Sequence, residues 1–218
     1  MISAAIAAAA ILAGCGGGSR QDANEPSANF PVQVASATFP TSQRLSQHSH
    51  LVISIRNVGT RTIPDIAITI CPITCTYNAK TGYPTGGGVD AQAFGEDLSM
   101  PYLANPSRPV WIVDRPPGLC GYSCKSGGPG SAVTAYTNTW ALGPLKPGAI
   151  ATFDWGVTAV QPGTHIVAWE VAAGLNGKAR AVLPGGGNAP PGGTFRVSVS
   201  NQPQQSYVSD GGKIIVSK

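Results

Sequence analysis

Three observations predict an all-β chain folded as an antiparallel sandwich. Short segments of alternating apolar and polar residues recur along the chain, each about the length of a strand. Its 28 glycines and 19 prolines include those between the segments, where they suit turns. No stretch beyond the first apolar run repeats its apolar residues with a helical period. Many short, half-buried strands joined by turns favour two sheets around one core.

The strand pattern is strongest where three apolar residues share one face. Leu51, Ile53 and Ile55 do so, as do Ile66, Ile68 and Ile70 further along. Phe153, Trp155 and Val157 form a third set, and Val167, Trp169 and Val171 a fourth, with Glu170 outward. The predicted strands are 30–35, 51–56, 63–70, 109–114, 135–142, 149–159, 165–171, 178–183 and 194–199.

Short connections predict which strands are neighbours. The turn at 57–60 separates 51–56 from 63–70 and predicts that the two pair in one sheet. The Pro-Gly turn at 161–163 predicts a tight hairpin between 149–159 and 165–171.

Two parts of the chain resemble bacterial immunoglobulin-like modules of the CARDB type. They are 51–59 with 63–66, and Leu145-x-Pro147-Gly148 with Phe153, Trp155 and Val157, followed by 163–167. The resemblance implies an immunoglobulin-like β-sandwich that acts as a spacer, adhesion element or accessory binding domain, without catalytic residues. We place the domain at 30–200, with an insertion at about 71–134. Residues 201–218 are a C-terminal tail or an extra edge strand.

The first residues indicate export. Residues 1–14 are almost wholly apolar but shorter than the roughly 20 residues that span a bilayer, which is typical of a signal peptide. Leu12-Ala13-Gly14-Cys15 resembles the lipobox of bacterial lipoproteins, which implies cleavage before Cys15 and a lipid on its thiol. A secretory signal with an incidental cysteine is the alternative.

Residues 15–29 are rich in glycine and polar residues, so we expect a flexible tether. The expected location is the cell membrane or outer envelope, facing outside the cytoplasm, with the lipid anchor in the membrane. The net charge of +4 comes from scattered basic residues, so no nucleic-acid partner is expected.

Four more cysteines form two C-x3-C pairs, Cys71 with Cys75 and Cys120 with Cys124. Outside the cytoplasm they most simply form two disulfides, and both local and crossed pairings stay open. A zinc site, an iron–sulfur cluster or a redox pair is the alternative, although the spacing is not the C-x2-C of such sites. We expect no cofactor and no bound metal.

Aromatic residues supply the candidate ligand-binding surface. Tyrosine on loops makes good contacts with partners, and exposed tryptophan faces can stack on sugars. The set is Tyr77, Tyr83, Tyr102, Trp111, Tyr122 and Trp140. The alternative is that these rings pack the insertion onto the sheet.

The three histidines are weak candidates for chemistry. His48 and His50 lie two apart, on the face shared with Ser54 and Arg56, and favour a solvent-facing polar edge over a chelating copper or zinc site. His165 follows a turn and is predicted to be structural.

No nucleophile elbow, H-E-x-x-H or phosphate-binding loop occurs, so we expect no enzyme. The sequence thus predicts a non-catalytic envelope lipoprotein with an interaction, adhesion or spacer module. A carbohydrate- or cell-wall-binding accessory is the alternative. A metal or redox protein that uses the C-x3-C pairs is a third.

Overall fold

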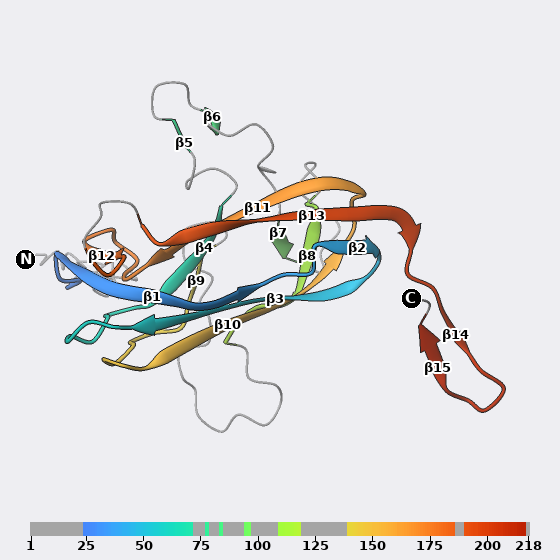
Figure 1. The fold of residues 1–218 in the computed structure, drawn as a ribbon, viewed down its shortest axis with the longest axis horizontal. Helices are drawn as coiled ribbons and strands as arrows, with labels where there is room; N and C mark the ends of the chain where they lie inside the picture. Colours follow the sequence, from blue (N-terminus) through green and yellow to red (C-terminus); the bar gives the residue numbers. More distant parts are fainter. Residues whose placement is uncertain are drawn as a thin grey trace, which may run out of the picture.

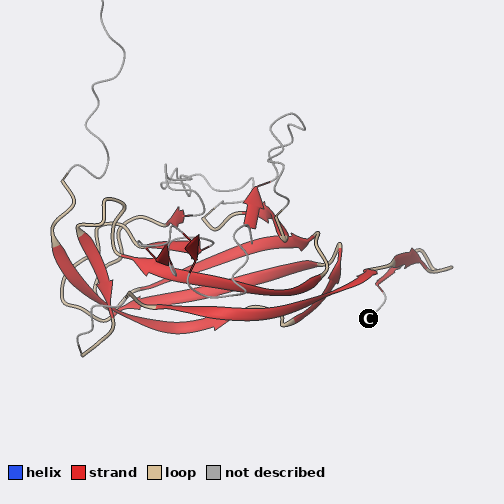
Figure 2. Ribbon diagram, turned by 90° about the horizontal axis from the view of Figure 1, so that it is seen from above, coloured by secondary structure: helices blue, strands red, loops and turns tan. Residues whose placement is uncertain are grey.

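The fold is described from a computed structural model. It is described for the residues 24–71, 77–78, 83–84, 94–96, 109–118, 139–185 and 190–216. These residues contain strands and no helix (Figures 1 and 2), and none of them belongs to a helix long and apolar enough to cross a membrane.

Two sheets make up the body of the domain. The six-stranded sheet has the order β12 (Ala179–Val182), β1 (Ala28–Thr38), β3 (His48–Asn57), β10 (Ile150–Ala159), β8 (Trp111–Arg115), β7 (Phe94–Glu96). The five-stranded sheet has the order β2 (Ser42–Leu45), β13 (Gly192–Pro203), β11 (Gly163–Ala172), β4 (Ala67–Cys71), β9 (Thr139–Ala141). Two further pairs lie outside these sheets, β5 (Tyr77–Asn78) with β6 (Tyr83–Pro84) and β14 (Ser206–Val208) with β15 (Ile214–Val216).

The core lies between the two sheets and confirms the predicted inward faces. Ile53 of β3 and Trp155 of β10 are fully buried from one sheet, as are Ile68 of β4 and Val167 of β11 from the other. Polar outward neighbours such as Ser54, Thr69 and Asp154 are partly exposed, because successive side chains of a strand point to opposite faces. The predicted immunoglobulin-like β-sandwich is therefore confirmed.

Both predicted strand neighbours are wrong. β3 and β4 belong to different sheets, and so do β10 and β11. Each short connection crosses between the sheets, which pack about 10 Å apart, so a few residues bridge them. β3 pairs instead with β1 and β10, and β11 pairs with β4 and β13.

The sheets are mixed, with parallel pairs among the mainly antiparallel ones. β1 pairs in parallel with β12, β13 with β2, and β7 with β8. Each of these pairs includes a strand at the edge of its sheet.

The predicted turn at 145–148 takes the form that its residues favour. Pro147 and Gly148 are its central residues, and the N–H of Ala149 donates to the carbonyl of Lys146 at 3.1 Å. Gly148 has φ of +75°, which a type II turn requires at its third position and which glycine adopts without strain.

Asn57 ties this turn to the end of β3. Its buried side-chain amide donates to the carbonyls of Leu145 at 2.8 Å and Arg61 at 2.9 Å, and its Oδ1 accepts from the N–H of Gly59. The Asn-x-Gly turn is thereby joined to the Pro-Gly turn next to β10.

The N-terminal boundary of the folded part lies before residue 30. Glu25 accepts three backbone hydrogen bonds, from the N–H groups of Leu175, Asn176 and Ala179 at 2.6–2.7 Å. β1 begins at Ala28. The expected tether therefore ends earlier than residue 29, because an acidic side chain attaches the chain to the loop before β12.

Candidate interaction surface

The insertion begins and ends at one edge of the five-stranded sheet. β4 ends at Cys71 and β9 begins at Thr139, and the two strands pair antiparallel. The hydroxyls of Thr69 and Thr139 lie 2.9 Å apart across this pair. Both ends of the insertion are thus held side by side.

Part of the insertion belongs to the sandwich itself. β7 and β8 extend the six-stranded sheet beyond β10, with Val113 opposite Val157 and Trp111 opposite Ala159. The insertion between β4 and β9 therefore contributes two strands to the opposite sheet. The predicted strand at 109–114 lies within the predicted insertion, but its place in the six-stranded sheet was not predicted.

An aromatic cluster joins β7 and β8 to the rest of the core. Phe39 packs against Phe94, Trp111 and Phe195, with ring centroids 5.3–6.3 Å apart. Trp111 also contacts the ring of His165 at 5.7 Å. Edge-on arrangements of this kind favour aromatic pairs beyond their buried area. His165 is buried in this cluster, which agrees with the structural role predicted for it.

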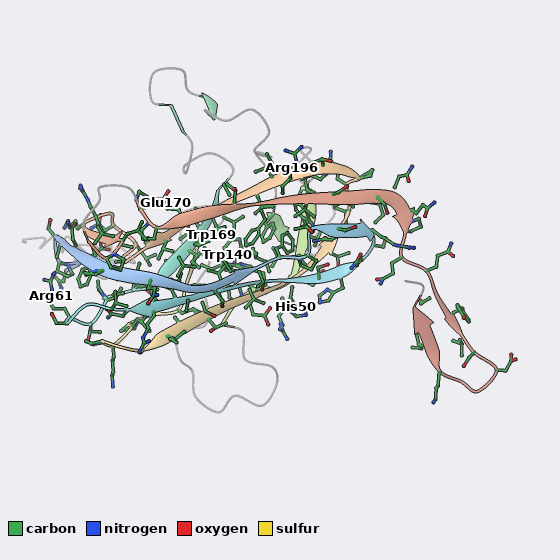
Figure 3. The ribbon with its side chains drawn as sticks, viewed as in Figure 1. His50, Arg61, Trp140, Trp169, Glu170 and Arg196 are labelled. Atoms are coloured by element: carbon green, nitrogen blue, oxygen red, sulfur yellow. The ribbon has the colours of Figure 1, made fainter. Side chains whose placement is uncertain are left out.

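The two tryptophans that were predicted to bind a ligand are both buried. Trp111 is fully buried, and its indole N–H donates to Oε1 of Gln43 at 2.8 Å. Trp140 is 2% exposed and meets Trp155 edge to face at 5.6 Å. The sugar-stacking prediction for these two residues is therefore wrong, because both rings point between the sheets (Figure 3 shows Trp140 there).

The tyrosines and cysteines of the insertion lie mostly outside the described residues. Tyr77 and Tyr83 are placed by backbone only, where β5 pairs with β6. Cys71 is placed the same way, opposite Ala168 of β11. The other predicted residues outside the description are Tyr102, Tyr122, Cys15, Cys75, Cys120 and Cys124. The lipid and the disulfides stay predictions.

His48 and His50 lie exposed on the outer face of β3, as predicted. Their partners were not predicted: each ring meets an aspartate from another strand, Asp114 of β8 for His48 and Asp154 of β10 for His50. Only the cross-strand register brings these residues together. Among the described residues, no group of three or more His, Cys, Asp or Glu is arranged to hold a metal ion.

Two carboxyl groups elsewhere are shifted in pKa. Burial raises the pKa of Asp65 above its usual 3.8, against the lowering effect of a hydrogen bond from the N–H of Gly143, and nearby Glu25 raises it further. Burial also raises the pKa of Glu170, on the outer face of β11. Glu170 lies on β11, whereas Asp65 lies in the connection between β3 and β4.

These features define the class of protein as an immunoglobulin-like β-sandwich with a long insertion. No family model and no curated protein matches the chain. Solved structures of similar fold include native E. coli α2-macroglobulin, at 13% identity and a TM-score of 0.40, over 81% of this chain and 7% of that one. A CARDB domain from Pyrococcus furiosus is similar at 14% identity and a TM-score of 0.38, over 79% of this chain and 96% of that one.

A β-glucosidase from Listeria innocua is also similar, at 11% identity and a TM-score of 0.32, over 80% of this chain and 16% of that one. The chain thus spans a small part of the macroglobulin and the glucosidase. At these identities and scores, the similarities say nothing of what this chain binds or does.

Proposed function

We propose that the protein is a non-catalytic module, held on the outer side of a bacterial membrane by a lipid on Cys15, that presents its insertion to a protein partner. The observation that carries the proposal is the way in which the sandwich holds the insertion. Its ends meet at β4 and β9, and β8 pairs with β10 and so fixes the middle of the insertion to the opposite sheet. Loops placed by a rigid scaffold are where proteins commonly carry binding residues.

The anchor fits the position of the N-terminal strand. Residues 16–24 separate Cys15 from the attached Glu25 and reach at most on the order of 30 Å when extended. Figure 1 shows β1 beginning at the end of the sandwich opposite to β14 and β15. A lipid on Cys15 would therefore keep the β1 end close to the membrane and direct the C-terminal hairpin away from it.

The first experiment tests the anchor. We expect the protein isolated from bacterial membranes to carry the added mass of acyl chains on Cys15 and to resist a high-salt wash. Cys15→Ser should lose the added mass and move to the soluble fraction, whereas Ser19→Ala should behave as the wild type. An unmodified cysteine, or release of the wild type by salt, would contradict the anchor.

The second experiment tests the binding surface. A photo-crosslinking amino acid placed at Tyr83 or Tyr122 should give a discrete protein adduct in intact cells. The matched control is Thr194, which is exposed on β13 and should give none. Adducts from Thr194 alone, or from no position, would exclude the insertion as the interaction surface.

A further inference from the structure

Two histidine–aspartate pairs lie side by side on the outer face of the six-stranded sheet. Nδ1 of His48 is 3.0 Å from Oδ2 of Asp114, and Nδ1 of His50 is 2.7 Å from Oδ1 of Asp154. The two rings are perpendicular, with centroids 5.2 Å apart. Both imidazoles are therefore held close together, and Figure 3 shows His50 pointing away from the core.

The hydrogen bonds determine which ring nitrogen is free. An ionised carboxylate only accepts hydrogen bonds, so Nδ1 of each ring must carry the hydrogen. In the neutral imidazole, Nε2 then keeps a lone pair. Histidines that bind metals usually donate their other N–H to a carboxylate or carbonyl in this way, which fixes the tautomer and the ring orientation.

Gly156 leaves room for this arrangement. On β10 it lies opposite His50 on one side and opposite Arg115 on the other. A Cβ at position 156 would stand 3.1 Å from Cε1 and 3.4 Å from Nε2 of His48. Nε2 of His48 therefore lies over the backbone of the residue directly opposite His50.

The surrounding charges favour a cation. Asp154 also accepts from Arg115 at 2.8 Å, and Asp114 accepts from the hydroxyl of Thr158 at 2.6 Å. Two carboxylates thus face a single guanidinium in the cluster. The side chains of His48 and His50 are 52% and 45% exposed, so an ion reaches both rings from solvent.

We propose that His48 and His50 bind one divalent transition-metal ion through their Nε2 atoms, with water completing its coordination. Asp114 and Asp154 act as positioning residues that hold the rings. Imidazole suits copper, nickel and zinc, and affinities for divalent ions at such a site peak at Cu²⁺. Since no third His, Cys, Asp or Glu of the described part is arranged to join them, the site is open and exchanges its ion with solvent.

The test is a Cu²⁺ titration of the full chain in detergent, with any free thiols alkylated beforehand so that cysteines do not compete. Electron paramagnetic resonance at less than one equivalent should show coupling to two imidazole nitrogens. His48→Gln and His50→Gln should each weaken binding at least about tenfold and remove the two-nitrogen signature, because one of the two ligands is lost.

Variants of the positioning residues distinguish an organised metal site from two surface histidines that bind copper without help from Asp114 and Asp154. Asp114→Asn and Asp154→Asn should weaken binding by about 10–100-fold while keeping two nitrogen ligands. Asp210→Asn, an exposed carboxylate in the β14–β15 turn, should have no effect. Unfolding midpoints measured in parallel report whether each variant folds. A spectrum and affinity unchanged in the His48→Gln/His50→Gln double variant would overturn the proposal.

Discussion

Single polar side chains hold the ends and turns of this domain. Glu25 accepts three backbone N–H groups of the loop before β12, and Asn57 satisfies two carbonyls and one N–H between two turns. Removing either side chain would leave buried or half-buried backbone groups without hydrogen-bond partners. Each such group lowers the free energy of unfolding by about 1–3 kcal/mol. The composition of 15–29 predicted a tether. No pattern in the sequence distinguishes Glu25, which binds the backbone of the folded domain, from the other polar residues of that segment.

Asp65 gives the fold a dependence on pH. Its carboxyl has a raised pKa, so between the usual value of 3.8 and the raised one the folded state binds more protons than the unfolded state. The free energy of unfolding therefore falls as the pH rises through this window. Above the window, the fold carries a constant penalty, which is the loss of stability from burying the charged carboxylate.

Asp65→Asn should remove that penalty. The amide oxygen can still accept from the N–H of Gly143, but it carries no charge to desolvate. We expect the variant to be more stable than the wild type at pH 7 and to lose this advantage toward pH 3, in urea unfolding at several pH values. An advantage that grows as the pH falls would contradict burial as the main cause of the raised pKa.

At the scale of the strand, alternation predicted the inward faces correctly and the pairing wrongly. The buried rows of β3, β10 and β11 agree with the sequence analysis. Their neighbours do not, because an apolar row faces the core equally well whether the next strand lies beside it or in the opposite sheet. A short turn can join two neighbouring strands of one sheet or two strands of opposite sheets. The length of the connection therefore does not predict which of the two arrangements forms.

Gly192 sets how closely β13 approaches β11. A Cβ at this position would collide with the backbone oxygen of Trp169, which cannot move without separating the two strands. Gly192→Ala should therefore lower the free energy of unfolding by about 1–3 kcal/mol, as overpacked sites do. Chemical denaturation measures the change.

Thr194→Ala is the matched control on the same strand. Thr194 is exposed and pairs with Ala168, which lies two residues before Glu170, the partner of Gly192, so its variant should lie within about 0.5 kcal/mol of the wild type. If Gly192→Ala and Thr194→Ala had the same free energy of unfolding, β13 and β11 could move apart at Gly192 without loss of stability, which would contradict this prediction.

At the scale of the whole molecule, the C-terminal hairpin stands apart from the sandwich. β14 and β15 pair with each other, and Tyr207, Val208 and Ile214 are 59–75% exposed. Figures 1 and 2 show the hairpin extending beyond the end of β13. Such a hairpin gains little from the core and contributes little to its stability.

Deleting residues 206–218 should change the free energy of unfolding by less than about 0.5 kcal/mol. The hydrogen bond from the N–H of Gln204 to the carbonyl of Leu45 remains in this variant. A deletion that begins at residue 198 also removes Val199, which is buried in the core, and should be strongly destabilising. A large loss from the shorter deletion would show that the hairpin packs on the sandwich.

The sequence by itself determined the all-β class, the inward faces and the turns at Asn57 and Gly148, because these follow from local periodicity and backbone preference. Only the tertiary structure decided the sheet to which each strand belongs, the burial of Trp111 and Trp140, and the meeting of His48 and His50 with Asp114 and Asp154. These depend on contacts between residues far apart in the chain. Cross-strand register sets such contacts, and no local pattern encodes it.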